Sequence, residues 1–324
     1  MKSNVGENAA IALQARAKIN LFLDITGRRA DGYHLLSTVM QEISLYDEVR
    51  LARSEPHALA GRPAVTVNNW SIFLTEEFSA ASEALGLRPL DNLMVRAAEL
   101  YAEACALSSR RPLVLTLDLV KHLPSKAGVG GGSADAAAVL NGLNSLFPGE
   151  LERGELFEIA ARLGADVPFC LHGGVAHCTG IGEIIKPLPS LPKWPLLLIK
   201  PDVEVSTALA FKRWDELIAG PRRQIRRPDT SACLEALAEC DLHKLRHAGG
   251  NVFETVVEPE YPELSRLLQT GYDTGASYCR MTGSGSAICA IYEDEATRDR
   301  AVDRTRWERG AAGRRCDLYP CNFI

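Results

Sequence analysis

The sequence predicts an α+β fold in two domains, and three observations lead to that prediction. The chain has 324 residues, which is more than one hydrophobic core usually organises. Strand-like and helix-like segments are mixed along it without the steady alternation that a doubly wound parallel sheet requires. Near residue 178 the pattern changes, and a proline-punctuated segment follows it. We therefore expect an N-terminal domain of residues 1–178 and a C-terminal domain of residues 179–324.

The expected elements follow from local periodicity. Strands are expected at 11–25 (one or two), 36–51 (a pair), 113–120, 173–178, 181–186, 196–200, 278–282 and 286–292. Helices are expected at 91–107, 134–147, 151–163, 208–218, 231–246 and 261–269. We expect the pair at 36–51 to break near Tyr46 and Asp47. Asp91 is the expected N-cap of its helix, and Gly164 closes the helix that precedes it.

Charge and cysteine usage exclude several classes of protein. The net charge of −5 disfavours a nucleic-acid binder, and the one dense basic run, at 222–227, is interpreted as a solvated loop. Nine cysteines without C-x-x-C spacing disfavour zinc and thioredoxin-type sites, and predict free thiols in a reducing compartment. The polar N-terminal segment does not predict a secretory signal, and no apolar run approaches the roughly 18 residues of a membrane span. We expect a cytoplasmic protein that binds neither nucleic acid nor membrane, as a monomer or weak homodimer.

A glycine-rich loop between a predicted strand and a predicted helix is the most informative segment. Residues 128–132 read Gly-Val-Gly-Gly-Gly, which costs conformational entropy and adds nothing to packing. Such a loop is useful where backbone N–H groups must approach a bulky anion at the positive end of a helix. Ser133 is placed as the helix N-cap or as a hydroxyl contact to phosphate or magnesium. Neither a Walker A loop nor a dinucleotide fingerprint fits, and a ligand-free turn explains this glycine density poorly.

The same stretch resembles the phosphate-binding motif of the GHMP kinases, which include galactokinase and the homoserine, mevalonate and phosphomevalonate kinases. It reads P-x-x-x-G-V-G-G-G-S-A-D from Pro124 to Asp135. Four further stretches resemble the branch of that family that acts on a cytidine-diphosphate-linked methylerythritol. They are AKINLFLDITGRRADGYH at 17–34, DNLMVRAA at 91–98, LGADVPFC at 163–170 and MTGSGSA at 281–287. The resemblance spans most of the chain and is weak at 53–80, at 220–235 and past residue 295.

This resemblance implies a two-domain GHMP kinase fold with the active site in the cleft between the domains. It implies that ATP, accompanied by Mg²⁺, gives its γ-phosphoryl group to the 2-hydroxyl of the methylerythritol moiety in non-mevalonate isoprenoid biosynthesis. The N-terminal domain would bind ATP and the C-terminal domain the acceptor. The implied nucleotide-binding residues are Pro124, Ser125, Lys126, Ala127, Gly128, Val129, Gly130, Gly131, Gly132 and Ser133, and Ser133 is also the candidate magnesium ligand.

The resemblance also assigns a catalytic pair. Asp166 is the residue that orients and deprotonates the acceptor hydroxyl, and Lys18 is its charge partner. Phosphoryl transfer passes through a loose transition state, so positioning and charge neutralisation matter more than a strong base. A lysine within about 4–6 Å keeps a carboxylate ionised and offsets charge on the phosphoryl oxygens. Taken outside the motifs, an exposed strand lysine and a turn or cap aspartate would be the favoured interpretations.

Matching positions also suggest an acceptor site. Tyr33 and Phe211 would sandwich the cytosine and His34 would hydrogen-bond its polar edge, because stacking stabilises a bound base by about 1–3 kcal/mol. Asn20 and Thr207 would contact the erythritol or its phosphates. A homoserine or mevalonate kinase would need no such clamp, and a non-catalytic ATP or metabolite sensor would need neither Lys18 nor Asp166. Both alternatives remain open beside the prediction of a kinase that acts on the cytidine-linked acceptor.

Overall fold

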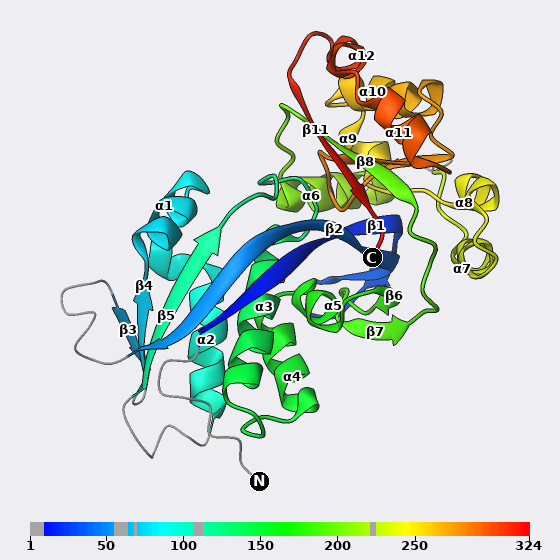
Figure 1. The fold of residues 1–324 in the computed structure, drawn as a ribbon. Coiled ribbons are helices and arrows are strands. Elements are labelled where there is room, and N and C mark those ends of the chain that lie inside the picture. The colour runs from blue at the N-terminus through cyan, green and yellow to red at the C-terminus, as the bar shows by residue number, and fades with distance from the viewer. Residues whose placement is uncertain (1–9, 55–63, 68–69, 106–112, 221–224) are drawn as a thin grey trace. The chain divides into compact units, whose positions relative to one another are not determined.

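The computed structural model describes residues 10–54, 64–67, 70–105, 113–220 and 225–324. The described residues form two compact units, and the chain passes between them several times (Figure 1). The first unit takes the described parts of Met1–Ala17, Tyr46–Leu123 and Gly130–His172. The second takes Lys18–Leu45, Pro124–Val129 and Gly173–Ile324. The long strands β1 (Ala10–Arg28) and β2 (His34–Ser54), which pair with each other, each contribute to both units.

The first unit joins a sheet to a set of helices. Its strands are β3 (Ala64–Val67), β4 (Trp70–Leu74), β5 (Leu113–Val120) and the C-terminal part of β2, in the order β3-β4-β5-β2. Only the β4–β5 pair is parallel among these. Its helices are α1 (Glu76–Ala84), the 3₁₀ turn η2 (Pro89–Asp91), α2 (Leu93–Ala104), α3 (Gly131–Leu146), α4 (Arg153–Leu163) and α5 (Val167–His172).

The core of the first unit holds α3 in place. Trp70 is fully buried and contacts the rings of Tyr101 and Phe147 at centroid distances of 6.1 and 5.1 Å. Helix α3 is rich in alanine and packs against α2, α4 and α5, as Figure 1 shows. Its small buried side chains allow close helix packing, so the glycine loop that precedes α3 starts from a fixed position.

The second unit contains an antiparallel sheet in the order β11-β8-β10-β9. The strands of this unit, besides the N-terminal part of β2 and the C-terminal part of β1, are β6 (Val175–Thr179), β7 (Ile184–Pro187), β8 (Pro195–Pro201), β9 (Tyr278–Met281), β10 (Ile288–Ile291) and β11 (Cys316–Asn322). Its helices are α6 (Thr207–Ala219), α7 (Thr230–Ala238), α8 (Leu242–Ala248), α9 (Glu254–Val257), α10 (Pro262–Asp273), α11 (Glu295–Ala301) and α12 (Arg304–Gly310). Strands β6 and β7 extend the N-terminal part of β2, and α10 packs on β9 and β10.

Four expectations about local structure were wrong. Strand β2 does not break at Tyr46 and Asp47, because the Asp47 carboxylate is buried and accepts two backbone N–H groups. Asn92 caps α2, while Asp91 closes the preceding 3₁₀ turn and pairs with Arg88. The predicted helix at 231–246 is two helices, α7 and α8, because the chain turns at Cys240, whose φ is 54°. Helix α3 begins at Gly131, so Ser133 lies inside its first turn and is not the N-cap.

The α+β class is confirmed, whereas the boundary near residue 178 stays a prediction. None of the nine cysteines forms a disulfide bond, and seven of them are buried. Of the basic run, Arg222 and Arg223 lie outside the described residues, and Arg227 pairs with Asp24. Within the described ranges, no helix has the length and apolar composition needed to cross a membrane.

Candidate active site

The glycine loop has the backbone geometry of an anion-binding turn. Ala127 and Val129 are buried and anchor it, while Gly128 and Gly130 have φ of +76° and +69°, in the left-handed region that favours glycine. Gly130 is the N-cap of α3 and offers no side chain to the first N–H groups of that helix. These N–H groups and the positive end of a 16-residue helix are suited to a phosphate group.

An ion cluster in the first unit fixes the chain at the start of this loop. The Asp47 carboxylate accepts the backbone N–H groups of His122 and Leu123, with N···O distances of 2.6 and 2.8 Å. Lys121 Nζ donates to Asp47 and also to Asp135 on the first turn of α3, the latter at 2.9 Å. Burial raises the pKa of Asp135, against the lowering effect of the Lys121 ammonium group. The strand end and the helix start are therefore tied to one lysine.

Lys18 belongs to a buried polar network in the second unit. It is 3% exposed, its backbone N–H donates to Val129 O in the glycine loop at 3.0 Å, and its Nζ donates to Asn20 Oδ1 at 2.8 Å. Asn20 Nδ2 donates to Thr38 Oγ1, also at 2.8 Å. A buried ammonium group needs such partners, and they hold its direction.

The loop at residues 282–285 completes this network. Asn20 accepts the N–H of Gly283 and donates its own N–H to Thr282 Oγ1, both at 3.0 Å. Asn251 Nδ2 donates to Met281 O and Gly283 O at 2.8 and 2.7 Å. The Glu254 carboxylate accepts the Met281 N–H at 2.8 Å, which leaves this loop bound on both sides.

Asp166 lies in the first unit, in the turn between α4 and α5. The α4 helix ends at Gly164, as expected, and Asp166 O accepts the N–H of Cys170 at 3.0 Å as α5 begins. The side chain is half-buried. This turn places the Asp166 carboxylate immediately before the first residue of α5.

Two of the predicted acceptor residues, His34 and Phe211, form an aromatic pair in the second unit. The rings of His34 and Phe211 stack at 4.6 Å with an interplanar angle of 19°, and Phe253 meets Phe211 edge-on. His34 Nε2 lies 2.7 Å from Asp215 Oδ1. Tyr33 is 59% exposed, so its ring is available to a ligand. The structure therefore brings His34 and Phe211 together, and the Tyr33–Phe211 sandwich stays a prediction.

A cavity of about 430 Å³ lies beside the glycine loop in the second unit. It is lined by Lys126, Gly128, Glu204, Val205, Ser206, Thr207, Ser284 and Gly285. Thr207 Oγ1 and Ser284 Oγ are 2.8 Å apart, and Lys126 Nζ donates to Glu204 at 2.7 Å. Its volume falls within the range of small-molecule sites, and its polar lining suits phosphates and hydroxyls.

Known proteins share both the sequence and the fold of this chain. The models of the GHMP kinases N terminal domain and of the GHMP kinases C terminal match residues 92–174 and 230–306. The 4-diphosphocytidyl-2-C-methyl-D-erythritol kinases of Caldicellulosiruptor saccharolyticus and Symbiobacterium thermophilum are 36% and 38% identical to it. The alignments cover 91% of this chain, and 92% and 95% of those proteins. The chain belongs to the 4-diphosphocytidyl-2-C-methyl-D-erythritol kinases, in the GHMP kinase family.

Solved structures agree with this membership. A crystal structure of 4-(cytidine 5′-diphospho)-2C-methyl-D-erythritol kinase has a TM-score of 0.71 at 31% identity and covers 96% of this chain and 99% of that one. A homoserine kinase from Cytophaga hutchinsonii, at 17% identity, has a TM-score of 0.66 and covers 99% of this chain and 97% of that one, which shows a shared fold. The predicted family and the kinase class are therefore confirmed.

Several residues of this kinase that shape the site were missed in the sequence. Asp215 contacts His34 across 181 positions, and Asn251 and Glu254 hold a loop that follows them by some thirty residues. The polar pair in the apolar context N-V-F-E at 251–254 was the available signal for the loop anchor. Asp47 was mistaken for a strand break, although a charged residue inside an apolar strand is also typical of a buried anchor.

Proposed function

We propose that this kinase transfers the γ-phosphoryl group of ATP to the 2-hydroxyl of 4-diphosphocytidyl-2-C-methyl-D-erythritol, giving the 2-phosphate and ADP. Asp166 and Lys18 are the proposed catalytic pair. The observation that carries the proposal is the glycine loop, where left-handed Gly128 and Gly130 lead into a helix start without a side-chain cap. The family membership supports 4-diphosphocytidyl-2-C-methyl-D-erythritol as the acceptor. The proposed setting is the cytoplasm, with the chain as a monomer or weak homodimer.

The proposed chemistry depends on placement more than on base strength. Asp166 accepts a hydrogen bond from the 2-hydroxyl, aims its oxygen at the γ-phosphorus and takes the proton as the P–O bond forms. The bond from the γ-phosphorus to the β–γ bridging oxygen breaks, and ADP leaves with that oxygen. Lys18 offsets the negative charge of the phosphoryl oxygens, and its bonds to Asn20 keep its ammonium group directed.

Magnesium fits this site through the nucleotide. Ser133 is half-buried on the first turn of α3, so its hydroxyl lies at the same helix start as the proposed phosphate site. Across the described ranges, no three His, Cys, Asp or Glu side chains gather as a metal site. Ser133 and the phosphate oxygens would therefore hold the ion, which would neutralise charge on the β- and γ-phosphates.

The His34–Asp215 contact supports recognition of cytosine. In the neutral tautomer of His34 whose Nε2 donates to the Asp215 carboxylate, Nδ1 is the acceptor nitrogen. Cytosine carries an exocyclic amino group that can donate to this nitrogen, whereas uracil carries a carbonyl oxygen at that position. Tyr33 and Phe211 would stack on the base, and Asn20 and Thr207 would contact the erythritol or its phosphates. Because homoserine and mevalonate carry no base, these contacts to cytosine favour the cytidine-linked acceptor over both.

The decisive experiment is turnover with ATP, Mg²⁺ and candidate acceptors, with phosphorus NMR locating the new phosphate. We expect phosphorylation of the cytidine-linked acceptor at the 2-hydroxyl, and little activity on its uridine analogue, methylerythritol phosphate, homoserine or mevalonate. Equal turnover of the cytidine and uridine compounds would contradict the role of His34. Phosphorylation of homoserine or mevalonate in preference would overturn the acceptor.

Asp166→Asn tests the catalytic assignment. We expect kcat to fall by about 10²–10⁴-fold while the KM for ATP stays within about threefold, because the carboxylate acts on the acceptor hydroxyl. Asp303→Asn is the matched control, since Asp303 also precedes a short helix but lies on the exposed N-cap of α12. Near-normal turnover by Asp166→Asn would remove that residue from the mechanism.

A further inference from the structure

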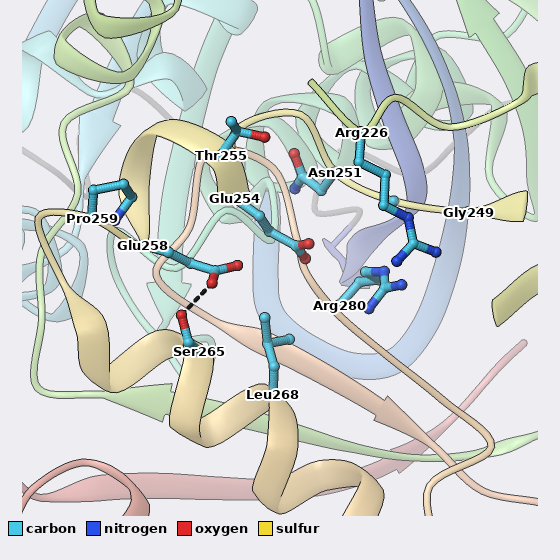
Figure 2. Close-up of a pocket in the computed structure, with 11 residues that line it drawn as sticks. Arg226, Gly249, Asn251, Glu254, Thr255, Glu258, Pro259, Ser265, Leu268 and Arg280 are labelled. Atoms are coloured by element: carbon cyan, nitrogen blue, oxygen red, sulfur yellow. Dashed lines mark hydrogen bonds between the residues drawn. The ribbon is translucent and has the colours of Figure 1, made fainter. Parts of the chain in front are cut away.

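A second cavity of about 570 Å³ lies in the second unit and contains none of the proposed catalytic, nucleotide or acceptor residues. Figure 2 shows its lining, which comes from the segment before α7, the α8–α9 connection, α9, α10 and β9. The lining residues are Arg226, Gly249, Gly250, Asn251, Glu254, Thr255, Glu258, Pro259, Ser265, Leu268 and Arg280. Its volume is that of a small-molecule site.

Arg280 on β9 has an incompletely satisfied guanidinium group. Its Nη1 donates to Tyr272 Oη at 3.1 Å and to Cys279 O at 3.0 Å. Its Nε is buried and has no acceptor among the described residues. The Nε–Nη2 edge is the one that binds a carboxylate or phosphate through two parallel hydrogen bonds. A buried donor without an acceptor costs about 1–3 kcal/mol, and an oxyanion that reached this edge would remove that cost.

Arg226 provides a second cation to the same cavity. Among the described residues it makes a single hydrogen bond, from Nη2 to His247 O, which is long at 3.4 Å. Within the described part of the chain, neither Arg226 nor Arg280 has a carboxylate within 4.0 Å. The adjacent Arg227, by contrast, binds both oxygens of Asp24 at 2.9 Å. Two arginines therefore meet in one cavity without counter-charges in contact.

The two glutamates of the lining do not cancel this charge. Glu258 accepts a hydrogen bond from Ser265, and Figure 2 shows this pair on the other side of the cavity from the arginines. Glu254 faces them, but one of its oxygens holds the Met281 N–H. Burial raises the pKa of Glu254 to about 7, against the lowering effect of Arg280, so it is only partly ionised at neutral pH. The arginine end of the cavity is therefore net positive.

We propose that this cavity is a binding site for a phosphate-type oxyanion, distinct from the nucleotide and acceptor sites. Two guanidinium groups that converge on one space suit a dianion better than a single carboxylate. The volume also accommodates a group larger than one phosphate. The shared chemistry is a phosphoryl group, carried either by inorganic phosphate or diphosphate or by a phosphomonoester.

Calorimetric titration of the full chain in low-salt chloride buffer tests this site. The probes are inorganic phosphate, diphosphate and methyl phosphate, which separate the free anions from a phosphomonoester. A non-hydrolysable ATP analogue and cytidine diphosphate are present at saturation, so that the catalytic site is occupied. We expect at least one probe to bind, and Arg226→Gln and Arg280→Gln each to raise its Kd about tenfold or more.

Arg300→Gln is the control, because Arg300 is exposed on α11 and lies outside the cavity lining. The Arg300→Gln variant should bind the probe with the same Kd as the unmodified chain. Arg226 is exposed, so the Arg226→Gln variant is expected to fold. If Arg280→Gln does not fold, the Kd of Arg226→Gln alone decides whether the arginines bind the probe. The proposal is overturned if no probe binds, or if Arg226→Gln binds the probe as tightly as the unmodified chain does.

Discussion

Gly128→Ala tests whether the backbone of the glycine loop needs its missing side chain. Gly128 has a φ of +76°, where an alanine costs about 1–2 kcal/mol. A Cβ there would also lie 2.3 Å from Thr282 O, inside any allowed contact. Overpacking of this kind costs about 1–3 kcal/mol. The free energy of unfolding should therefore fall by about 2–5 kcal/mol.

Gly149→Ala separates the two contributions. Gly149 has a φ of +80°, but a Cβ there meets nothing within 4 Å, so this variant carries only the backbone cost. We expect its free energy of unfolding, measured by urea denaturation, to be about 1–2 kcal/mol lower and its activity to be unchanged.

In Gly128→Ala the loop must shift to relieve the contact with Thr282, and a displacement near 1 Å in a positioning element can lower activity about 10²-fold. The measured quantity is kcat/KM for ATP at a temperature where both variants are folded. If the Gly128→Ala value lies within about twofold of the Gly149→Ala value, the close approach has no functional role.

Three further variants test separate parts of the structure. Tyr33→Ala should raise the KM for the acceptor at least about tenfold and leave the KM for ATP unchanged, because stacking is worth about 1–3 kcal/mol; equal effects on both would count against the clamp. Asp47→Ala should lower the free energy of unfolding by about 3–5 kcal/mol in urea titrations, since it leaves two backbone N–H groups and Lys121 short of a partner; a loss below about 1 kcal/mol would contradict the anchor. Glu254→Gln keeps an acceptor for the Met281 N–H but removes the ionisation. The pKa of Glu254 is raised from 4.5 to about 7 by burial, so the folded state binds the proton more tightly than the unfolded chain. The unmodified kinase should therefore lose stability relative to Glu254→Gln as the pH rises from 4.5 through 7, and parallel pH profiles would contradict this.

Alternation and helical spacing predicted most elements because one face of each is buried. Strand β5 and helix α10 follow their patterns closely, with apolar residues directed to the two cores. The pattern failed where a polar residue has a buried partner far along the chain. Asp47 binds the backbone at residues 122 and 123, and no local signal distinguishes such a carboxylate from a turn residue.

The candidate site was predictable only in part, for a related reason. Glycine density and motif resemblance indicated the proposed phosphate loop and the proposed catalytic pair, because those features lie within short segments. The contacts that orient the proposed residues join distant segments: His34 with Asp215, Asn20 with Thr282, and Glu254 with Met281. One sequence alone does not show which distant residues are in contact, so the contacts of Asp215 and Glu254 became visible only in the structure.

The glycines of this kinase have two separate physical roles. At Gly130 the missing side chain leaves the helix start open to a ligand. At Gly128 it allows one backbone to touch another, since a Cβ on Gly283 would in turn lie 3.0 Å from Gly128 O. The 282–285 loop is itself bound by Asn20 and Asn251, so this backbone contact passes their rigidity to the phosphate loop. Asn251→Ala should therefore raise the KM for ATP although the residue lies outside the nucleotide loop, and an unchanged KM would show that the two loops are set independently.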